Sequence, residues 1–124
     1  MDISVTRDTG IPVLRVEEER LDAAVALDFK EAVRARLLPG DEAMVLDLSQ
    51  VRFLDSSGLG AVVWIMKLFD SPRALHLAGL TPAVARVFDL TRMDRVFAIH
   101  ADAPGALTAM RGTEDAGVVA LRPA

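Results

Sequence analysis

The sequence predicts an α/β domain with a mixed β-sheet, an opening hairpin and about four helices. Three observations lead to this fold class. Short apolar runs alternate with segments whose apolar residues recur every three or four positions. The alternation follows two short apolar segments that a turn separates, which is typical of a hairpin. With 124 residues, 52% of them hydrophobic, the chain has the size of one domain with its own core.

The chain opens with two predicted strands, at residues 3–5 and 11–16. The segment between them contains Asp8-Thr9-Gly10, residue types that turns prefer. Pro12 cannot donate a ladder hydrogen bond, and it is tolerated because it stands near the beginning of the second strand. We therefore expect these two strands to pair as a hairpin.

The first helix is predicted to begin at Leu21, where the apolar period changes to three and four. Asp22 is the expected N-cap, and Pro39-Gly40 is expected to end the helix. The apolar face of this helix consists of Leu21, Val25, Phe29, Ala32, Val33 and Leu37.

The remaining elements continue the alternation of strand and helix. In chain order, we expect a strand at 44–48, a helix from 56 to about 69, a strand at 74–78, a helix that Thr81 caps and Pro82 begins, a strand at 96–99 and a weaker helix at 104–111. The last segment, 112–124, mixes Gly, Pro and charged residues with a short apolar run, and it is a tail or an added strand.

The expected crossovers between strands place three groups of residues at one edge of the sheet. Right-handed crossovers make the strands at 11–16, 44–48 and 75–78 parallel, so their carboxyl ends share an edge. This edge would collect the residues at 17–19, 55–57 and 79–81, and α/β folds usually place their sites there. We expect the acidic triplet Glu17-Glu18-Glu19 to neighbour the serine pair.

Composition excludes several classes of function. The net charge of −4 disfavours binding to nucleic acid, and the apolar stretch at 56–66 is about half as long as a membrane helix requires. Asp2 and Arg7 interrupt any secretory signal, so we expect a cytoplasmic protein. The absence of cysteine removes disulfides and thiolate sites. No Walker A motif or complete dinucleotide fingerprint occurs, and we expect no cofactor and no metal.

The most informative passage is Asp55-Ser56-Ser57-Gly58-Leu59-Gly60, between an apolar strand and an apolar helix. A serine here can accept hydrogen bonds from free backbone N–H groups, which Gly58 and Gly60 leave sterically open, and such an end attracts anions, including phosphate. From physics alone, an equally good interpretation is that Asp55, Ser56 and Ser57 merely cap a helix and turn a corner.

This passage, with the strand at 45–48 and Phe53 before it, resembles the signature of the STAS domain, the family of bacterial anti-sigma factor antagonists. Leu21-Asp22 and the segment 81–89 match the pattern of the family in order and spacing. The resemblance covers about residues 3–110. It implies a STAS domain at 1–111, followed by the segment 112–124.

The resemblance implies a switch protein that is not an enzyme. In the family, a partner that is both serine kinase and anti-sigma factor phosphorylates the first hydroxyl residue after the Asp, and a metal-dependent serine phosphatase removes the phosphate. Carried over, the acceptor is Ser56, supported by Asp55, Ser57 and Gly58, and the unphosphorylated protein occupies the kinase. The alternative is a STAS subunit of a lipid-transport or transporter complex without a phosphoswitch.

Two positions depart from the pattern of the family. Glu19 stands where the family often has Gly, which makes the turn before the first helix more negative. Arg92 replaces a Gly that is common after the third helix, which argues against a left-handed helix ending of the usual kind.

The second helix is apolar nearly all round. At 100° per residue, one face is predicted to pack on the sheet and consists of Leu59, Val62, Val63, Met66 and Phe69; the other consists of Ala61, Trp64, Ile65 and Leu68. The second face is either covered by a neighbouring helix or is a partner-binding surface with Trp64 as anchor. In the second case, the partner-binding residues are Leu59, Gly60, Trp64 and Leu68.

Two other constellations point to no further site. Ser56 lacks the Gly-x-Ser-x-Gly context of a hydrolase, and His76 and His100 are interpreted as ordinary surface histidines. Successive carboxylates in the acidic triplet point in alternating directions at a strand end, which favours a solvated loop over a cation site.

Overall fold

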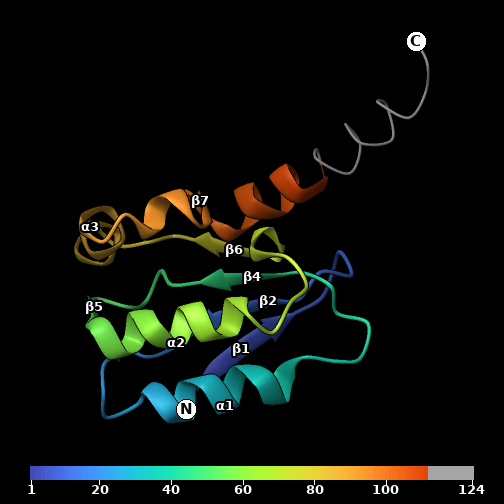
Figure 1. Cartoon of the computed structure of the whole chain (residues 1–124). Coiled ribbons are helices and arrows are strands. Elements are labelled where there is room, and N and C mark those ends of the chain that lie inside the picture. Colours follow the sequence, from blue (N-terminus) through green and yellow to red (C-terminus); the bar gives the residue numbers. More distant parts are fainter. Residues whose placement is uncertain (112–124) are drawn as a thin grey trace.

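The computed structural model describes residues 1–111, and its centre is a five-stranded mixed sheet (Figure 1). The strands are β1 (Ile3–Thr6), β2 (Val13–Val16), β4 (Met44–Asp47), β6 (Leu75–Ala78) and β7 (Ala98–His100), in the order β1-β2-β4-β6-β7. β1 and β2 are antiparallel, whereas all other neighbours in this sheet are parallel. The predicted hairpin and the predicted parallel strands are both confirmed. The segment 112–124, predicted as a tail or an added strand, lies outside the described residues.

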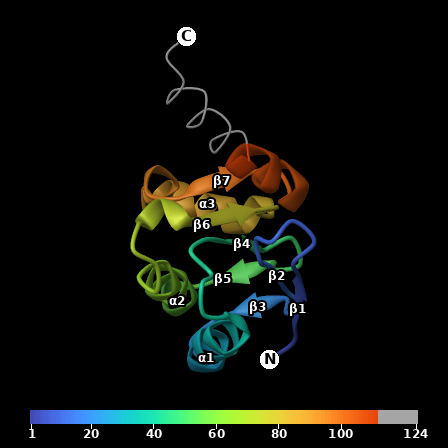
Figure 2. The ribbon, with the colours of Figure 1, turned by 90° about the vertical axis from the view of Figure 1, so that its right-hand side faces the viewer.

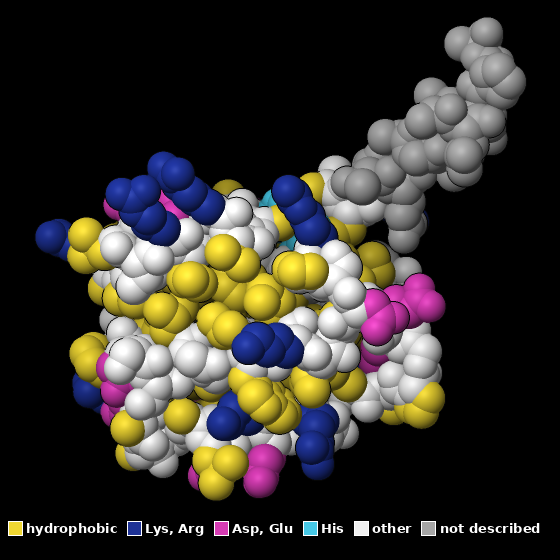
Figure 3. Space-filling view, in the orientation of Figure 1, with side chains coloured by type: hydrophobic (Ala, Val, Ile, Leu, Met, Phe, Trp, Pro, Cys, Tyr) yellow, Lys and Arg dark blue, Asp and Glu magenta, His cyan; other side chains and the backbone are white. Residues whose placement is uncertain are grey.

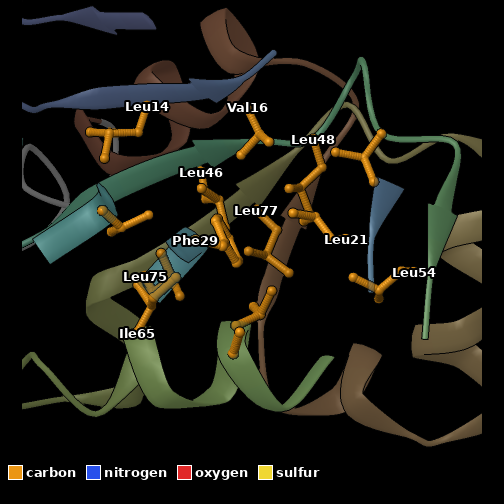
Figure 4. Packing of buried hydrophobic residues seen from close by; sticks show 14 of the residues in the cluster. Leu14, Val16, Leu21, Phe29, Leu46, Leu48, Leu54, Ile65, Leu75 and Leu77 are labelled. Carbon is orange, nitrogen blue, oxygen red and sulfur yellow. The ribbon is translucent and has the colours of Figure 1, made fainter. Parts of the chain in front are cut away.

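Helices cover both faces of this sheet (Figure 2). They are α1 (Ala26–Arg36), α2 (Ser56–Met66), α3 (Pro82–Leu90) and a helix at 103–111, with short 3-10 turns at Pro72–Ala74 and Met93–Arg95. Because side chains alternate along a strand, β2, β4 and β6 each contribute to two cores. Leu14, Leu46 and Leu77 belong to the larger core with residues of α1, α2 and α3 (Figure 4). Val13, Val45 and Ala78 belong to the smaller core beneath the helix at 103–111.

The first helix begins later than its apolar period predicts. Leu21 lies in β3 (Arg20–Leu21), which pairs in parallel with β5 (Phe53–Leu54) as a separate two-stranded sheet. Asp22 does not cap α1: its carboxylate accepts from the N–H of Ala24 at 3.1 Å within the turn that precedes the helix. The apolar spacing continues through this turn because Leu21 and Phe29 both enter the larger core, although they come from different elements.

Other element boundaries also differ from the sequence prediction. α2 ends at Met66 rather than near residue 69, and β7 begins at Ala98 rather than at 96. The Thr81 hydroxyl does not cap α3; it donates to the carbonyl oxygen of Val51 at 2.7 Å. This hydrogen bond ties the start of α3 to the loop before β5.

Arg92 follows α3 in the left-handed conformation, with φ = 60° and ψ = 19°. The expectation that replacing Gly argues against such an ending is therefore wrong: the chain keeps the left-handed residue and places arginine there. A side chain in this region is strained because its Cβ approaches the following carbonyl oxygen.

Arg92→Gly should raise the free energy of unfolding by about 0.5–1 kcal/mol, because glycine removes this strain. Urea denaturation measures the change. Thr91→Gly is the matched control, since Thr91 has φ = −93° and its hydroxyl donates to Val87, so the substitution should destabilise. A loss of stability in both variants would contradict the left-handed assignment.

The interpretation of His76 as an ordinary surface histidine is wrong, because this residue is half-buried. Its Nδ1 lies 2.9 Å from Nε2 of His100 on the neighbouring strand, and the ring centroids are 5.1 Å apart. Burial lowers the pKa of His76, and the charges of His100 and Arg73 lower it further. Both rings lie on the sheet face that carries the smaller core, opposite the face that α2 covers.

Candidate functional site

Asp55 joins β5 to α2 and fixes the first turn of the helix. Its backbone is extended, and its Oδ1 accepts from the N–H of Gly58 at 3.0 Å, as an N-cap does. Its Oδ2 accepts from the N–H of Ala23 at 3.2 Å, in the turn before α1. These hydrogen bonds, that from Gly58 most of all, lower the pKa of Asp55 although desolvation opposes them. The carboxylate is thus held ionised between two elements, which supports its predicted role beside the serines.

The two serines of the turn differ in accessibility. Ser56 is the first residue of α2 and is exposed, whereas Ser57 is half-buried. A modifying enzyme therefore reaches the Ser56 hydroxyl more easily than that of Ser57. Ser56, which the resemblance implies as the acceptor, is thus the more exposed serine of the pair, and its phosphorylation stays a prediction.

Gly58 lies where α2 crosses β3 at close range. A Cβ atom there would overlap the carbonyl oxygen of Leu21 and lie 2.8 Å from Cδ1 of Leu54. The residue is glycine because the two backbones need this space. At Gly60, by contrast, a Cβ atom would meet nothing within 4 Å.

Glu19 of the acidic triplet contacts the segment that leads into the serine turn, and it does so through its backbone. The carbonyl oxygen of Glu19 accepts from the N–H groups of Arg52 and Phe53, at 2.8 and 3.1 Å. The carboxylate of Glu17 instead accepts from the Ser4 hydroxyl at 3.0 Å, and that of Glu18 accepts from the N–H of Asp2. The structure therefore places Glu19 beside the segment that leads into the serine turn, whereas the carboxylates of Glu17 and Glu18 accept from Ser4 of β1 and from Asp2. Residues 1–111 contain no group of three or more side chains that could hold a metal ion.

Arg20 is a charged residue of the site that the sequence did not reveal. Its guanidinium lies 4.1 Å from the ring centroid of Phe53, and its Nε donates to Asp22 at 3.2 Å. Its charge also contributes to the lowered pKa of Asp55. The pairing of β3 with β5 brings Arg20 here across more than 30 residues of chain, and a two-residue strand leaves no readable alternation in the sequence.

The faces of α2 differ from those predicted. Ala61 and Ile65, assigned to the outer face, are buried in the larger core together with Val62. The most exposed line along the helix contains Ser56, Gly60 and Lys67. The helical wheel places Trp64 on one flank of this line, and Leu59 and Met66 on the other.

The two flanks of α2 face different neighbours. Trp64 is half-buried, and the Nζ of Lys30 on α1 lies 5.5 Å from its ring centroid. Leu59 and Met66 therefore lie on the flank away from α1. Hydrophobic side chains gather in a band on this side of the molecule (Figure 3). Leu68 is 38% exposed and lies beyond the end of the helix.

Comparison with known proteins agrees with this architecture. The family model of the STAS domain matches residues 2–106. The chain belongs to the STAS domain family. This STAS domain is 32% identical over 103 residues to the anti-sigma-B factor antagonist of Listeria monocytogenes, a match that covers 80% of this chain and 90% of the relative. It is 26% identical over 112 residues to the anti-sigma F factor antagonist of Paenibacillus polymyxa, covering 87% and 93%.

A solved structure shows the same fold. The crystal structure of an anti-sigma factor antagonist from Mycobacterium paratuberculosis superposes with a TM-score of 0.79 at 28% identity, covering 89% of this chain and 93% of that one. The STAS domain described here thus groups with the anti-sigma factor antagonists in sequence and in structure. Within residues 1–111, no helix is both long and apolar enough to cross a membrane.

Proposed function

We propose that this STAS domain acts by occupying a cytoplasmic anti-sigma factor that is also a serine kinase, and that phosphorylation of Ser56 ends the binding. The observation that carries the proposal is the exposed Ser56 hydroxyl at the start of α2, in a turn that Asp55 holds with hydrogen bonds to Gly58 and Ala23. The relatives are named as antagonists of anti-sigma factors, and they match over most of both chains. No nucleic acid takes part in this function.

The switch reaction modifies this protein and uses no catalytic group of its own. The kinase transfers the terminal phosphoryl group of ATP to Oγ of Ser56: the new P–O bond forms, the bond to the ADP oxygen breaks, and the hydroxyl proton passes to a base of the kinase. A metal-dependent serine phosphatase reverses the modification with water. The protein is therefore a substrate and a ligand and not an enzyme. The two histidines are not used in this reaction, because they pair with each other on the sheet face opposite α2.

Incubation with the cognate kinase and ATP should place one phosphate on Ser56, because this hydroxyl is the exposed one of the pair. Mass spectrometry of proteolytic peptides locates the modified residue. Ser56→Ala should abolish incorporation, whereas Ser57→Ala should retain it. Phosphate on Ser57 in the wild type would overturn the assignment, and no phosphate at all would favour the transporter-subunit alternative.

The proposed docking surface begins at Ser56 and extends along α2, over Leu59 and Gly60 toward α3. Leu59, Val63 and Met66 are partly buried against the larger core and belong to the flank of the helix that faces away from α1. Trp64 is the weaker candidate for an anchor, because α1 already covers part of it. Leu68 extends the surface past the helix end.

Val63→Lys should weaken binding of the partner kinase at least tenfold, about 1.4 kcal/mol, because it places a charge within a desolvated apolar contact. Isothermal titration calorimetry measures the affinity, and circular dichroism checks that the fold is intact. The matched control is Leu27→Lys, since Leu27 is an apolar residue of α1 that is 63% exposed. Equal affinity of the two variants would place the docking surface elsewhere.

A further inference from the structure

The two-stranded sheet of β3 and β5 holds a cation close to the proposed phosphorylation site. The register of this sheet pairs Arg20 with Phe53, which precedes Ser56 by only three residues. The guanidinium stacks over the Phe53 ring at 4.1 Å, and its Nε donates to Asp22 at 3.2 Å. Stacking and hydrogen bonding therefore hold this side chain near the turn, although 61% of its surface is exposed.

Most of the hydrogen-bonding capacity of Arg20 is unused. Only Nε is engaged, by Asp22, and the two terminal amino groups donate to no atom within residues 1–111. Guanidinium groups bind phosphate best through two parallel N–H donors, and the free amino groups of Arg20 provide such donors.

A phosphate on Ser56 cannot rely on the first turn of α2 alone. The N–H of Gly58 already donates to the Asp55 carboxylate, and the N–H of Leu59 donates to the Asp55 carbonyl oxygen. The ionised Asp55 also repels a second negative group beside it. A nearby cation would offset this repulsion, and Arg20 is the residue whose charge acts on Asp55.

We propose that Arg20 binds the phosphate of phosphorylated Ser56 within the same chain, as a two-donor clamp presented on the Phe53 ring. The inference rests on the proposed function for the modification itself. The two terminal amino groups donate to two phosphate oxygens, while Nε keeps its hydrogen bond to Asp22. Phosphorylation thereby changes the surface around β3 as well as that around Ser56.

A titration of the phosphate tests the clamp without the kinase. The full chain is made with phosphoserine incorporated at position 56 during translation, and the second ionisation of the phosphate is followed by 31P NMR. That ionisation normally has a pKa of about 6. A bound guanidinium favours the dianion, so Arg20→Gln should raise the phosphate pKa by about half a unit or more. Arg20→Lys, which keeps the charge, should restore part of this difference.

The control is Arg34→Gln, which removes another exposed arginine, from the last turn of α1. It should leave the phosphate pKa unchanged. Equal pKa values in the wild type and Arg20→Gln would overturn the clamp, as would an equal shift in the Arg34 variant. Because the phosphate is incorporated during translation, the outcome does not depend on the kinase: a kinase that ignores Ser56 contradicts the proposed function, while this titration addresses Arg20 alone.

Discussion

Gly58→Ala should lower the free energy of unfolding by about 3 kcal/mol, although alanine is the better helix former. The new methyl group would overlap the carbonyl oxygen of Leu21 and lie 2.8 Å from Cδ1 of Leu54. The Leu21 carbonyl cannot turn aside, because it is backbone and accepts from the N–H of Asp55 at 3.3 Å. α2 must therefore move away from β3, and Ser56 moves with it. Guanidinium denaturation followed by circular dichroism measures the loss of stability.

Gly60→Ala is the matched control on the same helix. Its methyl group meets no atom within 4 Å, so only the helix propensity changes, and stability should rise by up to about 1 kcal/mol. The two substitutions are chemically identical and lie two residues apart, but they should act in opposite directions. If both variants were more stable than the wild type, α2 would not cross β3 at the close range described.

The relative directions of the strands were predictable because the physics behind them is simple. Short buried strands joined by helical crossovers must be parallel, and the turn at Gly10 reverses the chain once, between β1 and β2. The start of α1 was not predictable in this way. Leu21 and Val25 are spaced as on a helix, but a two-residue strand and a turn fill the interval, and apolar spacing cannot distinguish these conformations.

One part of the candidate site was predictable, because the residue type at that position has a single physical role. Asp55 before a helix is an N-cap by its chemistry, and the structure shows the hydrogen bond to Gly58. The orientation of α2 was not predictable, because a helix that is apolar on most sides does not reveal which arc faces the sheet. Ile65 was therefore assigned to the outer face but lies in the core, and Arg20 required the pairing of β3 with β5.

Phosphorylation of Ser56 should reduce the affinity for the kinase partner at least tenfold, about 1.4 kcal/mol, without unfolding the protein. The modification adds about −1.5 to −2 charges at neutral pH, next to the ionised Asp55. Within the protein, the N-terminus of α2 offsets about 0.3–1 kcal/mol of the resulting repulsion, as is usual at an exposed site. The proposed contact with Arg20 adds to this offset, so the fold persists.

The phosphate should cost the partner interface more free energy than the contacts within the protein regain. A partner docked over the same turn must desolvate the phosphate, and an unfavourable unit charge at about 4 Å costs up to about 4 kcal/mol at an effective dielectric near 20. Calorimetric titration of the partner with three forms of the protein shows whether phosphorylation weakens or strengthens the binding. The phosphorylated form should bind most weakly, Ser56→Asp should lose less affinity because it carries less charge, and Ser56→Ala should bind as the unmodified protein does. Tighter binding by the phosphorylated form would mean that the phosphate is the recognition element, and that the partner captures the modified protein instead of releasing it.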